Sequence, residues 1–295
     1  MYELIQLSPR CYYVESPAKI GLVRLDGENV CLIDSGSDKD AGKKVLRHIE
    51  ANGWKLTAIY NTHSHADHVG GNRFLQERTG CRVYAPAIER DFTEHTVLES
   101  AFLYGGFPPK DLRHKFLYAQ ESAAEPLTDA VMPEGLSILP LPGHSFSMVG
   151  FFAPDGVCYI GDAVSSRETL EKYRVGFLYD VGAHLQTLEA LKSVEATCFV
   201  PSHAPATEDV KSLLDCNIDA VRETAERITA ICRTPQCFED VLARLFTDYG
   251  LDMSFQQYAL VGSTVRSYLS YLKTEGRVDV RIRDGYLLWE STENA

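Results

Sequence analysis

Three histidines and one aspartate stand close together in the run THSHADH at residues 62–68. Alternate side chains of an extended segment share a face, so His63, His65 and Asp67 can converge while His68 points elsewhere. Clustered imidazoles beside a carboxylate are costly to bury without a ligand, and zinc, iron and manganese all accept such nitrogen and oxygen donors. The run therefore predicts a metal site with two neighbouring positions.

The segments around this run predict the elements that must position it. Residues 56–62 form a strand-like apolar run, and Gly70 and Gly71 leave room for the backbone to turn closely beneath the site. Upstream, residues 21–34 are typical of two strands and residues 38–51 of a helix capped by Ser37 or Asp38. This alternation continues through the first two hundred residues and predicts a layered α/β domain.

Composition and charge restrict the classes of partner. Hydrophobic residues make up 45% of the chain and charged residues 24%, the ordinary balance of a globular protein. A formal net charge of -12 disfavours broad binding of nucleic acid. We find no secretory signal pattern, no apolar run long enough to span a bilayer and no Cys-x-x-Cys pair among eight cysteines. We therefore expect a reduced, cytoplasmic protein without membrane association.

Four further motifs accompany the histidine run. THSHADHVGG (62–71) resembles the His-x-His-x-Asp-His motif of the metallo-β-lactamase superfamily. LPGHS (141–145), YIGDAV (159–164) and VPSHA (200–204) are similar to its later histidine and aspartate motifs and follow in family order, while IDSG (33–36) resembles the turn before the metal region. The resemblance implies an α/β chain with the four-layer αββα fold of that superfamily over residues 1–207.

The resemblance also implies a dinuclear metal site. The residues it assigns are His63, His65 and His144 for one metal, Asp67, His68 and His203 for the second, and Asp162 as the bridge between them. Two divalent ions are expected, with zinc as the first choice and iron or manganese as alternatives.

Other residues near these motifs have less defined roles. Asp67 would also act in catalysis by orienting the nucleophile. Asp34 would either accept a hydrogen bond that fixes a ligand or only form the turn before Gly36. Two further histidines, His114 and His184, could reach the site from the insertion or from the segment after the bridging aspartate.

Two metals about 3.5 to 4 Å apart can share and acidify one water. The resemblance thus implies a hydrolase whose metal-bound hydroxide attacks an ester, thioester or phosphodiester, with a small molecule as the expected substrate. Hydrolysis of β-lactams is disfavoured, because typical members with that activity depart from this ligand set. Two alternatives stay open, an endoribonuclease of the lactamase-beta-like branch and a mononuclear iron persulfide dioxygenase. The oligomeric state is not predicted.

The remaining segments differ from the α/β part. An insertion at about 95–135 combines aromatic residues with Gly-Gly and Pro-Pro pairs, which predicts that it packs over another part of the protein. Residues 208–232 are expected to form a connecting helix. Residues 233–295 indicate two helices and a hairpin, a winged-helix-like C-terminal module that resembles the extension of the lactamase-beta-like branch.

An RNA-binding role would use five basic side chains on the predicted last helix and hairpin of this module. They are Arg266, Lys273, Arg277, Arg281 and Arg283. Interleaved acidic residues dilute this set, so we expect the module to pack on the catalytic domain or to shape its pocket.

Overall fold

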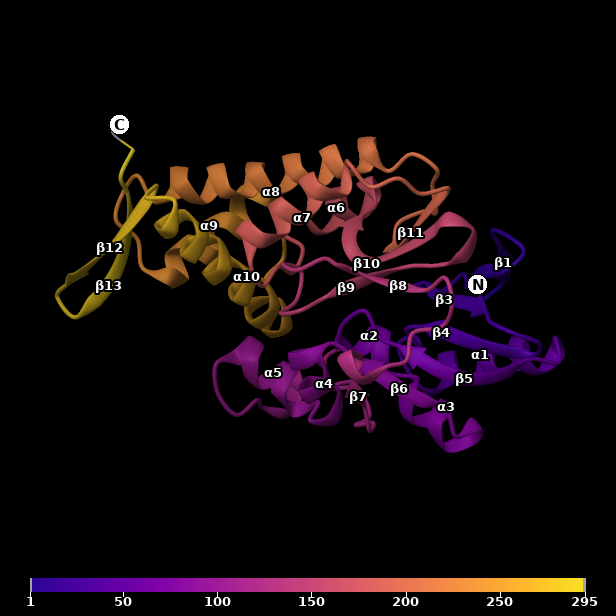
Figure 1. The fold of residues 1–295 in the computed structure, drawn as a ribbon. Coiled ribbons are helices and arrows are strands. Elements are labelled where there is room, and N and C mark those ends of the chain that lie inside the picture. The colour runs from indigo at the N-terminus through magenta and orange to yellow at the C-terminus, as the bar shows by residue number, and fades with distance from the viewer. Residues whose placement is uncertain (1, 294–295) are drawn as a thin grey trace.

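The computed structural model describes residues 2–293 and contains two β-sheets that face each other (Figure 1). The first sheet holds, in chain order, β1 (Leu4–Gln6), β2 (Cys11–Val14), β3 (Ile20–Arg24), β4 (Asn29–Ile33), β5 (Lys55–Tyr60), β6 (Arg82–Ala85) and β7 (Glu125–Pro126). Its pairs are antiparallel from β1 to β4 and parallel from β4 to β7. The strands predicted near residues 30–34 and 56–62 are therefore β4 and β5.

The second sheet is smaller and is also mixed. Its order is β11 (Cys198–His203), β10 (Val157–Ser165), β9 (Val149–Phe152) and β8 (Ser137–Pro140). β10 pairs in parallel with β11 and antiparallel with β9, which pairs antiparallel with β8. The motif YIGDAV (159–164) lies on β10, and VPSHA (200–204) overlaps the end of β11.

Helices cover the outer face of each sheet. α1 (Lys39–Ala51) and α3 (Asn72–Thr79) pack on the first sheet, whereas α7 (Val181–Leu191) and α8 (Lys211–Ile231) pack on the second. α1 begins as predicted, because the Asp38 side chain accepts two backbone N–H groups of its first turn. The order helix, sheet, sheet, helix confirms the predicted four-layer fold.

Three apolar clusters fill the spaces between these four layers. Tyr60 and Phe151 belong to the cluster between the sheets, Ile49 and Ile59 to the one beneath α1 and α3, and Leu188 to the one beneath α7 and α8. Burial of each such side chain stabilises the fold by about 1.5 to 3 kcal/mol. The packed sheets thus form a rigid support for the loops at their edges.

Short helices lie in the connections. They are α2 (Ala66–Val69), α4 (Ala87–Glu94), α5 (Val97–Tyr104), α6 (Arg167–Tyr173) and the single turns η1 (Lys110–Leu112), η2 (Leu127–Asp129) and η3 (Pro154–Gly156). The predicted insertion contains α5, η1, β7 and η2. It contacts the C-terminal helix α10 (Phe255–Thr274), where the rings of Tyr104 and Phe255 lie 6.1 Å apart. The expectation that the insertion packs over another part of the protein is met.

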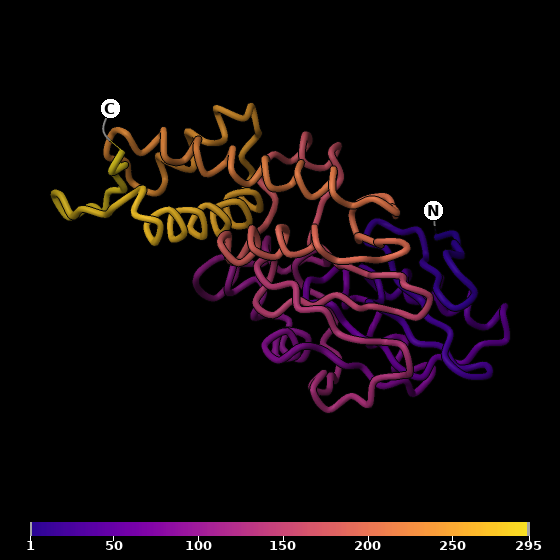
Figure 2. Tube along the Cα trace, turned by 45° about the horizontal axis from the view of Figure 1, so that its top comes forward, coloured from indigo at the N-terminus to yellow at the C-terminus, as the bar shows by residue number. Residues whose placement is uncertain are grey.

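The C-terminal segment is helical and ends in a hairpin. α8 runs along one side of the molecule from the second sheet to α9 (Phe238–Tyr249) and α10 (Figures 1 and 2). β12 (Val278–Arg283) and β13 (Tyr286–Ser291) pair antiparallel around the predicted turn. Two helices and a hairpin are thus present as predicted, while the winged-helix assignment and the division into three units stay predictions.

None of the described helices is long and apolar enough to cross a membrane.

Candidate metal centre

The predicted ligands come from four segments that meet where the two sheets face each other. His63 and His65 follow β5 in the first sheet. In the second sheet, His144 lies on the connection from β8 to β9, Asp162 lies within β10 and His203 is the last residue of β11. Both sheets therefore contribute side chains to the same place.

The first group of side chains is His63, His65, His144 and Asp162, whose candidate ligand atoms all lie within 4.8 Å of one another. Nδ1 of His65 lies 3.0 Å from Nε2 of His63 and 3.1 Å from Nε2 of His144. Oδ2 of Asp162 lies 3.5 Å from Nε2 of His144. This set of three nitrogens and one carboxylate oxygen is typical of a transition-metal site.

The second group is Asp67, His68 and His203, again within 4.8 Å. Nε2 of His203 lies 3.3 Å from Asp67 and 3.2 Å from Oδ2 of Asp162, and Nε2 of His68 lies 3.1 Å from Oδ1 of Asp162. Asp162 thus presents one oxygen to each histidine of the second group while also facing His144 of the first. A carboxylate placed in this way can bridge two ions.

The prediction that Asp67 shares a strand face with His63 and His65 is wrong. The extended backbone ends at His65, which directly precedes α2, so Asp67 and His68 lie on a helical turn. Asp67 therefore joins His68 and His203 instead of sharing a face with His63. The grouping implied by the family resemblance agrees with the observed one.

Asp34 organises ligands of both groups and is buried. Its Oδ2 accepts hydrogen bonds at 2.8 Å from Nδ1 of His68 and from the hydroxyl of Thr62. Because that hydroxyl donates to Asp34, its oxygen can accept from Nδ1 of His63 at 2.9 Å. Both imidazoles then direct Nε2 into the site, which is the orientation that a metal requires. Of the two roles considered for Asp34, the hydrogen bond to a ligand is present.

The atoms of His68 and Asp162 fit a bound cation. Within residues 2–293, Nε2 of His68 and Oδ1 of Asp162 are buried and lack a hydrogen-bond partner, although they lie 3.1 Å apart. When Nδ1 of His68 donates to Asp34, the neutral ring has a lone pair at Nε2. A lone pair and a carboxylate oxygen at this distance require a proton or a metal ion between them.

The charges of the site divide its histidines into two kinds. Burial lowers the pKa of His144 to about 3, so its ring is neutral and ready to bind a metal. The charge of Asp162 raises the pKa of His203 to about 10 despite the opposing effect of burial. Burial also opposes protonation of His68, but the nearby carboxylates outweigh it and hold the pKa of His68 well above its ordinary value. In the metal-free protein, protons thus occupy the second group.

Two histidines with open roles lie in different places. His184 is buried and lines a small cavity beside His144 and Asp162, and burial lowers its pKa to about 4. His114 lines a separate surface pocket near Lys115. Only His184 reaches the neighbourhood of the site.

Sequence reasoning missed two buried glutamates. Glu89 of α4 accepts hydrogen bonds from the loops that carry the ligands, and Oε1 of Glu99 in α5 lies 3.8 Å from Nε2 of His65. Burial raises the pKa of Glu99, against the opposing effect of His65. A single glutamate in a short helix has the same sequence pattern as a solvent-exposed one, so only the structure identifies them.

Aromatic rings form one wall beside the first group. The ring of Phe177 lies 5.1 Å from that of His65 and 5.8 Å from that of His144. The adjoining cavity has a volume of about 80 Å³, and Tyr268 of α10 contributes to its lining. The C-terminal helices therefore help to enclose the space beside the candidate ligands, as expected for a module that shapes the pocket.

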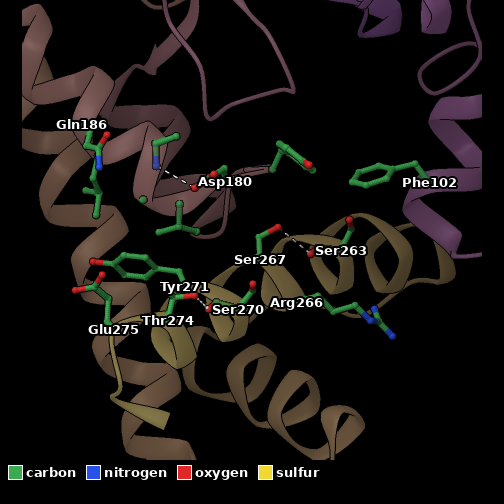
Figure 3. A pocket seen from close by; sticks show the side chains of 15 residues that line it. Phe102, Asp180, Gln186, Ser263, Arg266, Ser267, Ser270, Tyr271, Thr274 and Glu275 are labelled. Carbon is green, nitrogen blue, oxygen red and sulfur yellow. Dashed lines mark hydrogen bonds between the residues drawn. The ribbon is translucent and has the colours of Figure 1, made fainter. Parts of the chain in front are cut away.

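A larger pocket of about 910 Å³ lies between α10, the start of α7 and Phe102 of α5 (Figure 3). Ser263, Ser267 and Ser270 of α10 line it, with Asp180 on the opposite side. None of the seven predicted ligands lines this pocket.

Comparisons with known proteins agree with this geometry. A family model described as the metallo-beta-lactamase superfamily matches residues 14–203. A hydroxyacylglutathione hydrolase of Methylococcus capsulatus is 28% identical over 197 residues, which is 64% of this chain and 65% of that protein. The protein of the same name from Hyphomonas neptunium is 31% identical over 120 residues, or 40% of this chain and 38% of its own length. The chain spans less than two thirds of each of these relatives.

Solved structures share the fold over nearly the whole chain. A beta-lactamase domain protein from Burkholderia ambifaria superposes with a TM-score of 0.73 at 17% identity and covers 98% of this chain and 94% of its own. A metallo-beta-lactamase family protein from Thermus thermophilus gives 0.72 at 21% identity, with coverage of 97% and 100%. The fold, the motif order and the matched family model lead to one conclusion: the chain belongs to the metallo-beta-lactamase superfamily.

Proposed function

We propose that this protein is a metal-dependent hydrolase with a dinuclear centre. The proposed ligands are His63, His65 and His144 for the first ion, Asp67, His68 and His203 for the second, and Asp162 for both. The observation that carries the proposal is the meeting of two compact ligand groups at Asp162, whose Oδ1 lacks a hydrogen-bond partner in the described chain. Zinc is the proposed metal, because imidazole and carboxylate donors suit it, and iron and manganese are the alternatives.

When bound, two divalent ions supply an acidified water as nucleophile and stabilise the negative charge that develops on the substrate. Other residues of the chain orient the proposed histidine ligands. Asp34 and Thr62 hold His68 and His63 with Nε2 facing inward, and the carbonyl of Pro17 lies 2.9 Å from Nδ1 of His203 and fixes that ring in the same way. Asp67 would orient the attacking water.

For the substrate, we propose a small acyl thioester. The relatives described above carry the name hydroxyacylglutathione hydrolase, and hydrolysis of such a compound breaks a thioester bond. The cavity of about 80 Å³ beside His144 and Asp162 has room for a short acyl group. A small molecule is therefore the proposed partner.

The charges of the C-terminal helices and hairpin support a small substrate over RNA. Four of the five basic side chains considered for RNA form ion pairs: Lys273 with Asp279, Arg277 with Glu226 and Glu293, Arg281 with Glu290, and Arg283 with Asp284. The fifth, Arg266, lies 3.7 Å from the centre of the Phe238 ring. A phosphate backbone would have to displace these partners.

Elemental analysis and a substrate panel test the proposal. We expect two metal ions per chain and faster hydrolysis of thioesters than of phosphodiesters, lactones or β-lactams. The variants His65→Ala and Asp162→Ala should lose both metal and turnover, and full activity in either would contradict the ligand assignment. One iron per chain with oxygen consumption would instead support a persulfide dioxygenase, and salt-dependent RNA binding with cleavage would support an endoribonuclease.

Cellular location is a separate proposal. All eight cysteines are free, as expected in a reducing compartment, and we propose the cytoplasm.

A further inference from the structure

Glu89 is completely buried, and four hydrogen-bond donors surround its carboxylate. Oε2 accepts the backbone N–H of Ser64 at 3.0 Å and the Ser64 hydroxyl at 2.6 Å. Oε1 accepts the Ser145 hydroxyl at 2.8 Å and the backbone N–H of Ser147 at 2.9 Å. Both oxygens are therefore fully occupied, which is the condition under which a carboxylate can be buried at acceptable cost.

The four donors belong to two loops from different sheets. Ser64 stands between His63 and His65 after β5, while Ser145 follows His144 on the connection to β9. One carboxylate thus joins the loop with two proposed ligands of the first ion to the loop with the third. Within the described residues, no donor to Glu89 comes from α2, which carries Asp67 and His68, or from β11, which carries His203.

α4 is itself held in place beside these loops. The hydroxyl of Thr93 donates to the backbone carbonyl of Glu89 at 2.9 Å, one turn along the helix. The ring of Phe92 packs 4.9 Å from that of Phe146, the residue between Ser145 and Ser147. These contacts hold α4, and with it the Glu89 carboxylate, in a fixed position beside the ligand loops.

From this arrangement we infer that Glu89 is a positioning residue for the first metal site, a role that rests on the proposed metal-dependent function. It sets the separation of the two loops so that Nε2 of His63, Nδ1 of His65 and Nε2 of His144 converge at about 3 Å. Without the carboxylate, the ligand from the second sheet is free to move away from the two from the first. The second group keeps its own supports at Asp34 and Pro17.

The variant Glu89→Gln tests this role with little change in volume. An amide has one oxygen and one NH₂ group, so the NH₂ must face a backbone N–H of either Ser64 or Ser147, and that loop is released. The matched control is Thr93→Val, which removes a buried hydroxyl from the same helix without changing any contact to the ligand loops.

Metal affinity is measured by chelator competition with Zn²⁺, and ligand geometry by the visible absorption of the Co²⁺-loaded protein. We expect one of the two metal equivalents of Glu89→Gln to bind about 10- to 100-fold more weakly, with an altered Co²⁺ spectrum. The other equivalent should keep its affinity, and Thr93→Val should resemble the wild type in both measurements. A merely structural role would weaken the two equivalents together and leave the spectrum of the bound ion unchanged.

A second variant covers the case in which Glu89→Gln does not fold. Ser64→Ala combined with Ser145→Ala removes both hydroxyl donors and leaves the buried carboxylate with its two backbone partners, and the same equivalent should weaken. Wild-type affinity for both equivalents in the variant that folds overturns the role of Glu89. A wild-type protein that takes up neither Zn²⁺ nor iron or manganese overturns the proposed function, so the two failures are distinguishable.

Discussion

Replacement of Asp34 by asparagine measures how much the orientation of two ligands contributes to metal binding. Asp34 has a φ of 63°, a left-handed conformation that asparagine tolerates better than most residues, so the backbone should be retained. The amide, however, cannot accept from all the donors around it. Either Nδ1 of His68 and the Thr62 hydroxyl, or the backbone N–H of Thr62, then faces an NH₂ group.

The expected size of the effect follows from these contacts. Loss of a hydrogen-bond partner behind a metal ligand lowers metal affinity about 10- to 100-fold, which corresponds to about 1.4 to 2.7 kcal/mol. A buried donor left unpaired also lowers the free energy of unfolding of the metal-free protein by about 1 to 3 kcal/mol. Both effects should appear together in Asp34→Asn.

Chelator competition with Zn²⁺ and urea unfolding in the presence of EDTA measure the two quantities. Asp155 offers a matched control, because it also has a φ of 63° and its carboxylate accepts from Ser8 and Arg10 far from the ligand groups. Asp155→Asn should leave metal affinity unchanged. If Asp34→Asn bound zinc as tightly as the wild type does, the proposed role of Asp34 would be refuted.

Three further predictions concern protons, backbone and metal. Because Asp162 raises the pKa of His203 to about 10 and the pKa of His68 is also raised, a metal must displace at least one proton. Zinc affinity should therefore rise at least about tenfold per pH unit from pH 7 to pH 9; a plateau above pH 7, measured by chelator competition, would contradict this. Gly161→Ala should cost about 1 to 2 kcal/mol of unfolding free energy in urea, since Gly161 has a φ of 52° and an added Cβ would lie 3.2 Å from Thr62; unchanged stability would argue against strain there. Removal of metal with EDTA should lower the free energy of unfolding by about 2.7 kcal/mol for each bound ion, relative to protein in metal at about a hundred times its Kd. An identical thermal midpoint in calorimetry would speak against binding to the folded state.

Short-range patterns predicted much of this molecule. The strand before the histidine run, the helix capped at Asp38 and the C-terminal hairpin each depend on residues that are neighbours in the chain. The seven proposed ligands could be named because their motifs occur in a fixed order, and they do lie together, although metal binding by them stays a prediction. The geometry within residues 63–68 could not be predicted from strand-like alternation, because a turn of helix begins after His65.

Contacts between distant segments could not be predicted in this way. Glu89 accepts hydrogen bonds from residues 25 and 56 positions away, and no local periodicity encodes that separation. The same holds for α5 and α10, which meet although they are far apart in the chain. Burial of a polar residue depends on the donors that surround it after folding, and these come from several elements.

Metal binding and the stability of the packed sheets are coupled, because each proposed ligand group draws residues from both sheets. Each group combines residues that follow β5 in the first sheet with residues of the second sheet, so an ion in either position ties the two sheets together. Without a metal the site carries an energetic cost, because Nε2 of His68 and Oδ1 of Asp162 are buried and lack hydrogen-bond partners in the described chain. By linkage, whatever stabilises the packed sheets also favours metal binding, and bound metal stabilises the packing to the same extent. The apolar cluster around Phe151 and the carboxylate of Glu89 therefore both favour metal binding. The cluster sets the distance between the sheets, and the proposed role of Glu89 is to set the distance between their loops.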